Sequence, residues 1–156
     1  MGCGIFISTL LIVSGCSTFG SKFNQNRVAQ FKQDTSVGTE DISIAALGLV
    51  DVPYRFGGNT PKGGFDCSGL VKYVFAQFNI DVPRVVEQQW EVGEKIKPAN
   101  IKPGDLLFFG EGDSARDITH VGVSLGGWKM IHASRGRNGV YIDDVQQNEG
   151  LRAIFV

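Results

Sequence analysis

The segment GGFDCSGLVKYVF, residues 63–75, passes from a glycine-rich loop into a helical pattern. From Leu70 to Phe78 apolar residues recur at steps of three and four, which is the spacing of one face of an α-helix. Asp66 precedes this pattern, at the position where a side-chain oxygen commonly caps a helix. The segment therefore predicts a helix that begins after Asp66 and carries Cys67 in its first turn.

The first turn of a helix is a favourable place for a reactive thiol. Backbone N–H groups there have no partner within the helix, and the helix dipole is positive at that end. Both effects favour a thiolate at Cys67, and the same N–H groups can hold an oxyanion when a carbonyl is attacked. Ser68 and Gly69 are small and leave the sulfur open to a substrate. A nucleophile and a small buried core thiol remain the two interpretations of Cys67.

The other two cysteines lie near the N-terminus. Ile5 to Val13 is an apolar run that is too short for a stable transmembrane helix and suits the central region of a signal peptide. Val13-Ser14-Gly15-Cys16 resembles a bacterial lipobox, in which the cysteine becomes the lipidated first residue of the mature protein. We therefore predict a signal peptide over residues 1–15, which includes Cys3, and a lipid on Cys16. A buried N-terminal strand is the alternative.

Polar residues dominate from Ser17 to Thr39. Residues 16–39 are therefore predicted to form a lipidated cysteine followed by a flexible linker, and residues 40–156 to form the folded domain. After removal of the signal peptide, Cys67 would be the one cysteine of this domain, so the prediction excludes an internal disulfide.

Composition is that of an ordinary globular protein. The chain has 156 residues, of which 42% are hydrophobic and 20% charged, enough for one domain with a core. The net charge is -1 and no basic stripe is present, so no nucleic-acid partner is expected. The 21 glycines favour tight turns and short strands over a helix bundle.

Hydrophobic spacing predicts helices first and strands afterwards. A first helix is expected from Asp41 to about Val50, a second after Asp66, and a short helical turn over Val86–Glu91. Strands are expected over Asp105–Phe109, His120–Leu125, Lys129–Ala133, Gly139–Val145 and Arg152–Val156. This order predicts an α+β domain in which N-terminal helices pack on a curled antiparallel β-sheet.

A nucleophilic thiol needs a base, and the chain has two histidines, His120 and His132. Both lie in a predicted hairpin around Gly126-Gly127. A two-residue turn there would pair His120 with Ala133 and turn the two rings to opposite faces. A three-residue turn, Leu125 to Gly127, or a bulge, would pair His120 with His132 on one face, and we predict this second arrangement.

The second arrangement also assigns the residues that follow His120. Side chains alternate between the two faces of a strand, so Val121 and Val123 would point toward the core. Gly122, which is small, would lie beneath the active-site groove.

Five blocks of sequence carry a family resemblance. In chain order they are PYRFGG (53–58), GFDCSGLV (64–71), PGDLLFF (103–109), HVGV (120–123) and IHA (131–133). Their order and spacing resemble the successive motifs of the NlpC family over about residues 42–156. These proteins are papain-like cysteine peptidases of the bacterial cell wall, so the resemblance implies a papain-like fold with the catalytic cysteine at a helix N-terminus. Val85-Val86, where relatives often have Thr or Ser, and Ser124, in place of a common Tyr, depart from the pattern.

The resemblance implies a catalytic role for three residues. Cys67 would be the nucleophile. His120 would be the base that pairs with it and later protonates the leaving amine. His132 would hold His120 in the required tautomer.

Three further residues would surround the nucleophile. By the same resemblance, Tyr54 would help the Cys67 N–H bind the oxyanion; a half-buried aromatic beside a glycine turn is its structural alternative. Asp66 and Ser68 would line the groove, and some relatives use these positions to grip a peptide amine. Capping alone would already account for Asp66.

These expectations describe a cysteine endopeptidase that hydrolyses amide bonds in peptidoglycan stem peptides or cross-links through an acyl-enzyme on Cys67, without cofactor or metal. One Cys and two His are too few ligands for a zinc site. A non-catalytic cell-wall-binding lipoprotein, and an amidase or acyltransferase on the same fold, are the alternatives. Ser17 after Cys16 resembles an outer-membrane sorting pattern, so the lipid would anchor the protein on the periplasmic face of that membrane. The sequence leaves protein partners unknown.

Overall fold

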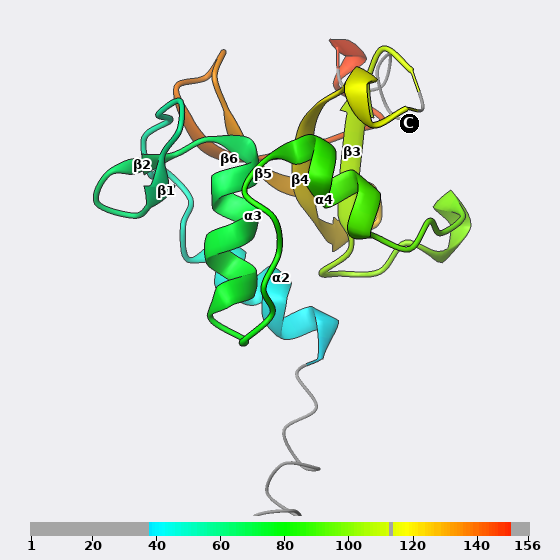
Figure 1. The fold of residues 1–156 in the computed structure, drawn as a ribbon, viewed down its shortest axis with the longest axis horizontal. Coiled ribbons are helices and arrows are strands. Elements are labelled where there is room, and N and C mark those ends of the chain that lie inside the picture. The colour runs from blue at the N-terminus through cyan, green and yellow to red at the C-terminus, as the bar shows by residue number, and fades with distance from the viewer. Residues whose placement is uncertain (1–37, 113, 151–156) are drawn as a thin grey trace, which may run out of the picture. The chain divides into compact units, whose positions relative to one another are not determined.

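Apart from one small hairpin, the described α-helices precede the strands along the chain (Figure 1). The computed structural model describes residues 38–112 and 114–150. The helices are α2 (Thr39–Leu47), α3 (Cys67–Ala76) and α4 (Val86–Val92), and the small hairpin joins β1 (Asn59–Thr60) to β2 (Gly64–Phe65). The predicted signal peptide, Cys16 and the predicted strand Arg152–Val156 lie outside the described residues.

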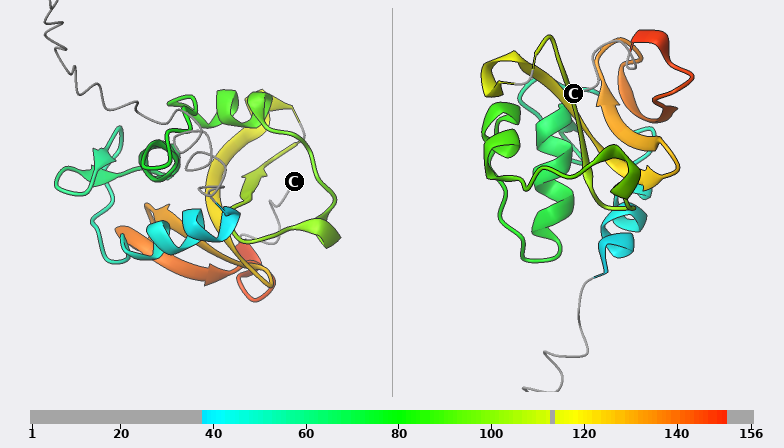
Figure 2. Two further views of the ribbon diagram at one scale, coloured as in Figure 1. Left: turned by 90° about the horizontal axis from the view of Figure 1, so that it is seen from below. Right: turned by 90° about the vertical axis from the view of Figure 1, so that its right-hand side faces the viewer.

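Four of the described strands form one antiparallel sheet in the order β3-β4-β5-β6. They are β3 (Leu106–Gly110), β4 (Ile118–Gly126), β5 (Lys129–Ser134) and β6 (Gly139–Asp144). The register shifts near the end of β3 and again near the end of β4, and such irregularities bend and twist strands. The sheet is accordingly curled (Figure 2). The predicted α+β class, with helices on a curled antiparallel sheet, is confirmed.

Helix α3, which positions Cys67, begins where the sequence predicts. The Asp66 carboxylate accepts a hydrogen bond from the Gly69 N–H at 2.7 Å, so a side-chain cap fixes the first turn. The apolar face of the helix is fully buried and consists of Leu70, Val71 and Val74. Burying one such side chain contributes about 1.5–3 kcal/mol of stability. This face therefore holds α3 against the core and so sets the position of Cys67 in its first turn.

The main core lies between the described helices and one face of the sheet. Helix α2 contributes Ile42 and Ala46, and α4 contributes Val86. The sheet contributes Phe108, Val121, Val123, Ile131, Ala133 and Val140. The predicted placement of the two β4 valines on the core side is therefore confirmed.

Helix α2 is shorter than predicted at its C-terminal end. It begins at Thr39, where the Asp41 carboxylate accepts a hydrogen bond from the Gly38 N–H at 3.1 Å. It ends at Leu47 rather than Val50 because the next residues donate hydrogen bonds to the carbonyl three residues earlier instead of four. The Leu49 N–H, for example, donates to the Ala46 carbonyl at 3.0 Å.

A smaller core occupies the opposite face of the sheet. It contains Leu107, Phe109, Met130 and Val145, with Ile101 and Trp128 packed against it. His120 lies directly across the β3–β4 ladder from Phe109. Residues that pair across an antiparallel ladder share a face, so His120 points away from the main core.

The β4–β5 hairpin has the bulge that was one of the two predicted forms, but its turn differs from the predicted Leu125 to Gly127. Gly126 pairs with Lys129, so the turn residues are Gly127 and Trp128, and both have positive φ. Positive φ at both turn positions is typical of a type I′ turn. Leu125 is then the extra residue where the register shifts.

This register corrects the predicted pairing of the histidines. Continued by one step from the Val123–Ile131 pair, it sets His132 opposite Gly122 and not opposite His120. A Cβ atom on Gly122 would lie 3.2 Å from the Cβ of His132, which agrees with this placement. His120 and His132 still share one face, as predicted. The extra residue Leu125 shifts the register so that Gly122 faces His132, and Gly122 lies on the same face of β4 as His120, two residues away.

Candidate active site

Cys67 is the first residue of α3, and its partly exposed side chain borders a groove of about 640 Å³. Three backbone N–H groups, those of Cys67, Ser68 and Val121, lie near the sulfur and lower its pKa. The thiol is therefore open to a ligand and surrounded by donors that stabilise negative charge near it.

The N–H of Val121 is available because two strands separate beside it. The β4–β5 ladder ends at the Val123–Ile131 pair. Beyond that pair, the start of β4 has no ladder partner on the β5 side among the described strands, while Val121 still pairs with Phe108 of β3. The N-terminus of α3 meets this free edge. His120 directly precedes Val121, so this contact places the backbone of the histidine strand beside the start of α3.

Burial raises the pKa of the Cys67 thiol, and the negative charge of Asp66 raises it further. The backbone donors of Ser68 and Val121 lower the pKa but do not outweigh burial. Burial thus opposes the thiolate that the helix N-terminus was expected to favour, and the pKa direction favours the neutral thiol. Deprotonation belongs to the step in which the sulfur attacks.

His120 and His132 form a hydrogen-bonded pair. Nε2 of His120 lies 2.7 Å from Nδ1 of His132, and the ring centroids are 4.9 Å apart at an interplanar angle of 80°. Burial lowers the pKa of His120, and the neighbouring His132 lowers it further, so the ring is neutral near pH 7. Nδ1 of His120 has no hydrogen-bond partner within residues 38–112 and 114–150, so one ring nitrogen is left for another group.

His132 is held from the opposite side by a carboxylate. Its side chain is almost fully buried, and its Nε2 lies 2.8 Å from Oδ2 of Asp143. Burial lowers the pKa of His132, while the hydrogen bond to Asp143 raises it but does not outweigh burial. Asp143 was not predicted. Asp143 lies on β6, the strand next to β5, so pairing of these two predicted strands could have indicated it as a neighbour of His132.

Tyr54 borders the same groove as Cys67. Its backbone N–H donates to the Asn138 carbonyl at 3.2 Å, which ties the segment before β1 to the β5–β6 turn. Burial raises the pKa of Tyr54, and the charges of Cys67 and Asp66 raise it further. The hydroxyl stays protonated and is available as a hydrogen-bond donor near the sulfur.

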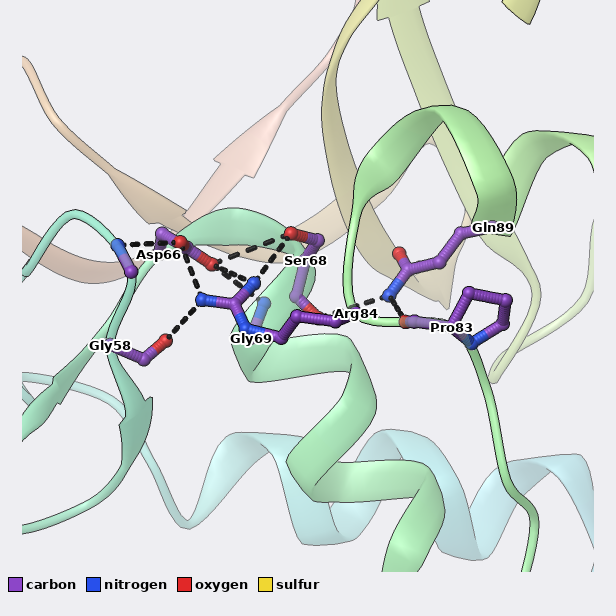
Figure 3. A network of polar contacts seen from close by, with 8 residues as sticks. Gly58, Asp66, Ser68, Gly69, Pro83, Arg84 and Gln89 are labelled. Carbon is purple, nitrogen blue, oxygen red and sulfur yellow. Dashed lines mark hydrogen bonds and ion pairs between the residues drawn. The ribbon is translucent and has the colours of Figure 1, made fainter.

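Asp66 lies at the groove with its carboxylate fully engaged (Figure 3). Oδ1 accepts hydrogen bonds from the Gly69 N–H at 2.7 Å and from Nη1 of Arg84 at 2.9 Å. Oδ2 accepts from the Gly57 N–H and from Nη2 of Arg84, both at 2.8 Å. These four donors account for the buried carboxylate without a substrate amine.

Arg84 joins Ser68 to the same network (Figure 3). Its Nη1 donates to the Ser68 hydroxyl at 3.0 Å, and its Nη2 donates to the Gly58 carbonyl at 3.3 Å. Arg84 thereby connects the loop before α3, the first turn of α3 and the segment before α4. No role was predicted for this residue, although it follows Pro83 and is a cation that an acidic helix cap can bind.

Gln89 supports the same wall of the groove from α4 (Figure 3). Its Nε2 donates to the carbonyls of Ser68 at 3.0 Å and Pro83 at 2.8 Å. Helix α4 itself begins without a side-chain cap, because the N-cap residue is Val85. The Val85-Val86 departure thus removes a local hydrogen bond, while Gln89 keeps α4 attached to α3.

Charged side chains border the groove beyond Asp66 and Arg84. Glu87 and Arg116 are exposed and contribute opposite charges. Among the described residues, no cluster of three or more His, Cys, Asp or Glu side chains is arranged to hold a metal ion. None of the helices described is long and apolar enough to cross a membrane.

Known sequences are similar to the part of the chain that contains this site. The family model described as the NlpC/P60 family matches residues 51–153, which include every site residue named above. Gamma-DL-glutamyl hydrolase from Bacillus subtilis is 54% identical over 100 residues, which cover 62% of this chain and 24% of that protein. The chain spans less than half the length of the curated relatives that it matches.

Solved structures share the fold. The NlpC/p60 domain of the peptidoglycan hydrolase SagA is similar with a TM-score of 0.65 and 36% identity, covering 72% of this chain and 93% of that chain. RipD from Mycobacterium tuberculosis, a non-catalytic NlpC/p60 domain protein with a peptidoglycan-binding function, has a TM-score of 0.60 and 28% identity, covering 70% of this chain and 89% of its own. These likenesses confirm the papain-like fold that the sequence motifs implied.

Proposed function

The chain belongs to the NlpC/P60 family, and on that basis we propose that it is a cysteine endopeptidase that hydrolyses amide bonds in peptidoglycan stem peptides or their cross-links. Cys67 is the nucleophile, His120 is the base, and His132 orients His120. One observation carries the proposal: the Cys67 thiol borders an open groove and lies near the N–H of Val121, the neighbour of a paired histidine.

The first step is attack of the Cys67 sulfur on the carbonyl carbon of the amide. As the C–S bond forms, the thiol proton passes to Nδ1 of His120, whose Nε2 is occupied by His132. A neutral thiol beside a neutral imidazole suits this concerted transfer, because neither partner carries a charge before the substrate arrives.

The carbonyl oxygen becomes an oxyanion in that step. The Cys67 N–H at the start of α3 and the protonated hydroxyl of Tyr54 are the donors that would hold it. His120 then gives its proton to the leaving amine as the C–N bond breaks, and the acyl group remains on Cys67. Water then attacks the acyl carbon and transfers a proton to His120. As the C–S bond breaks, His120 returns this proton to the sulfur, which releases the carboxylic acid and restores the thiol and the neutral imidazole.

Digestion of purified sacculi tests the proposal. The wild-type protein is expected to release muropeptides cut between stem residues or at cross-links, as identified by mass spectrometry. Cys67→Ala is expected to lower the rate by about 1,000-fold or more, because no other described side chain replaces the nucleophile. Undiminished digestion by this variant would overturn the proposal.

A non-catalytic wall-binding protein is the second candidate. It is favoured by the similarity to RipD, which is non-catalytic. The presence of Cys67, His120 and His132 favours the peptidase instead. Sacculus binding without release of any muropeptide by the wild-type protein would support the second candidate.

An amidase or acyltransferase on the same fold is distinguished by its products. An endopeptidase cuts between stem residues, whereas an amidase releases the whole stem from the sugar and an acyltransferase forms a new amide. The relative named gamma-DL-glutamyl hydrolase and the relative named peptidoglycan hydrolase SagA favour hydrolysis.

We also propose that the protein acts in the bacterial envelope and is anchored by a lipid on Cys16. The support is the apolar run Ile5–Val13, the lipobox-like Val13–Cys16 and Ser17 after it, which fits the periplasmic face of the outer membrane. Labelled palmitate is expected to enter the wild-type protein and not Cys16→Ala. Equal labelling of both would overturn the anchor and leave the peptidase proposal intact.

A further inference from the structure

A line of hydrogen bonds extends beyond the two histidines. His120 Nε2 and His132 Nδ1 are 2.7 Å apart, His132 Nε2 and Asp143 Oδ2 are 2.8 Å apart, and Arg137 Nη1 donates to Asp143 Oδ1 at 2.6 Å. The line thus runs from His120 to a partly buried carboxylate and then to an exposed guanidinium.

Strand register explains why the three side chains meet. His132 lies opposite Tyr141 of β6, and Asp143 is two residues further along that strand, on the same face. On the β4 side, the residue opposite His132 is Gly122. His120 lies two residues before Gly122 and is displaced along the sheet in the direction opposite to Asp143. The three residues therefore form a diagonal across β4, β5 and β6, and a diagonal neighbour is within reach of a long side chain.

Building on the proposed peptidase function, we propose that Asp143, held by Arg137, is a positioning residue that keeps the proton of His132 on Nε2 and so leaves Nδ1 of His120 free to take the Cys67 proton. A carboxylate accepts hydrogen bonds and cannot donate them, so Nε2 of His132 must carry a proton. Nδ1 of His132 is then an acceptor, and Nε2 of His120 must donate to it. Nδ1 of His120 consequently holds a lone pair, as a base requires.

Arg137 keeps the end of this line fixed. Its guanidinium lies 4.2 Å from the centroid of the Tyr141 ring, and the Ser134 hydroxyl accepts a hydrogen bond from its backbone N–H at 3.3 Å. Arg137 can donate only, so it always demands an acceptor at Oδ1 of Asp143. Because Arg137 always needs an acceptor, the effect of replacing the Asp143 carboxylate by an amide can be predicted and tested.

Asp143→Asn is expected to damage activity more than Asp143→Ala. In the asparagine variant, Arg137 takes the amide oxygen, so the amide NH₂ faces Nε2 of His132 and forces the proton to Nδ1. His120 then presents an N–H to Cys67 and cannot act as a base. We expect the kcat on isolated muropeptides to fall about 100-fold for Asn and about 10-fold for Ala, with KM nearly unchanged. A loss for Asn no larger than for Ala would overturn the proposal.

Rescue and a matched control separate this role from a structural one. Adding Arg137→Ala to Asp143→Asn frees the amide to turn its oxygen toward His132, and kcat should recover about 10-fold. Asp144→Asn removes the same charge from the neighbouring residue of β6 and should leave kcat and thermal stability unchanged. Failure of the double variant to recover would contradict the proposal.

Imidazole nitrogen NMR gives a readout that does not depend on turnover. In a Cys67→Ala background, the long-range proton–nitrogen spectrum should show His132 protonated on Nε2, and on Nδ1 after Asp143→Asn. A wild-type protein that cuts no peptidoglycan but shows these tautomers would overturn the proposed function alone. His132 protonated on Nδ1 with Asp143 present would overturn the inference alone.

Discussion

Among single residues, Gly69 is the position in the active-site wall that is least able to accept a side chain. A Cβ atom there would overlap the Gly58 carbonyl oxygen and lie 2.9 Å from Oδ1 of Asp66. The Gly58 carbonyl cannot move freely, because it accepts a hydrogen bond from the Asp66 N–H at 3.1 Å. Gly69→Ala is therefore expected to lower the free energy of unfolding by about 1–3 kcal/mol, as measured by urea denaturation.

Gly136→Ala is the matched control for that substitution. A Cβ atom on Gly136 meets no other atom within 4 Å, so the free energy of unfolding should stay nearly constant. Equal stability of the two variants would show that the contact between Gly69 and Gly58 is not constrained as the structure indicates.

The reactivity of Cys67 is a second property of a single residue. Because burial and Asp66 raise its pKa, its alkylation by iodoacetamide should increase with pH along a curve whose midpoint lies above that of an ordinary thiol. The measurement needs Cys3→Ser and Cys16→Ser so that one thiol remains, and the same protein in urea supplies the ordinary midpoint. A native midpoint below the one in urea would instead indicate a thiolate paired with imidazolium.

At the level of secondary-structure elements, α4 lacks a cap that a single substitution can supply. Val85 is the N-cap and is 42% exposed, so replacing one of its methyl groups by a hydroxyl costs little burial. Val85→Thr places an oxygen where it can accept a hydrogen bond from an N–H of the first turn. We expect the free energy of unfolding to rise by about 0.5–1.5 kcal/mol in urea denaturation.

Val92→Thr tests whether the position of the hydroxyl matters. Val92 is the last residue of α4 and is 67% exposed, and a hydroxyl there caps no N–H group. It should not raise the free energy of unfolding. A similar gain from both substitutions would contradict the capping argument.

Local signals determined which elements the sequence could predict. The start of α3 was predictable because Asp66 and the apolar steps after it lie within one short segment. The β4–β5 register was not, because Gly126-Gly127 is a strong turn signal, whereas the turn uses Gly127 and Trp128. A tryptophan with positive φ is uncommon, so the pattern pointed one residue too early.

At the scale of the whole molecule, contacts between segments far apart in the sequence account for the site features that were not predicted. The six predicted site residues came from motifs, but Arg84 and Asp143 act through tertiary contacts with Asp66 and His132. The protonation state of Cys67 also depended on packing, since a helix N-terminus favours a thiolate while burial, known only from the fold, opposes it.

Two neutral histidines in the sheet, of which His132 is buried and His120 is half-buried, also make the stability of the whole domain depend on pH. Burial lowers the pKa of His120 and His132 below that of an unfolded histidine, so below about pH 6.5 the unfolded chain binds protons that the folded chain does not. The free energy of unfolding should therefore fall as pH decreases from about 6.5 to about 5, by up to about 1.4 kcal/mol per pH unit for each histidine. In urea denaturation, His132→Gln should remove about half of this slope, because one titrating group remains. A wild-type slope of zero, or an equally steep slope in the variant, would contradict the burial of neutral imidazoles.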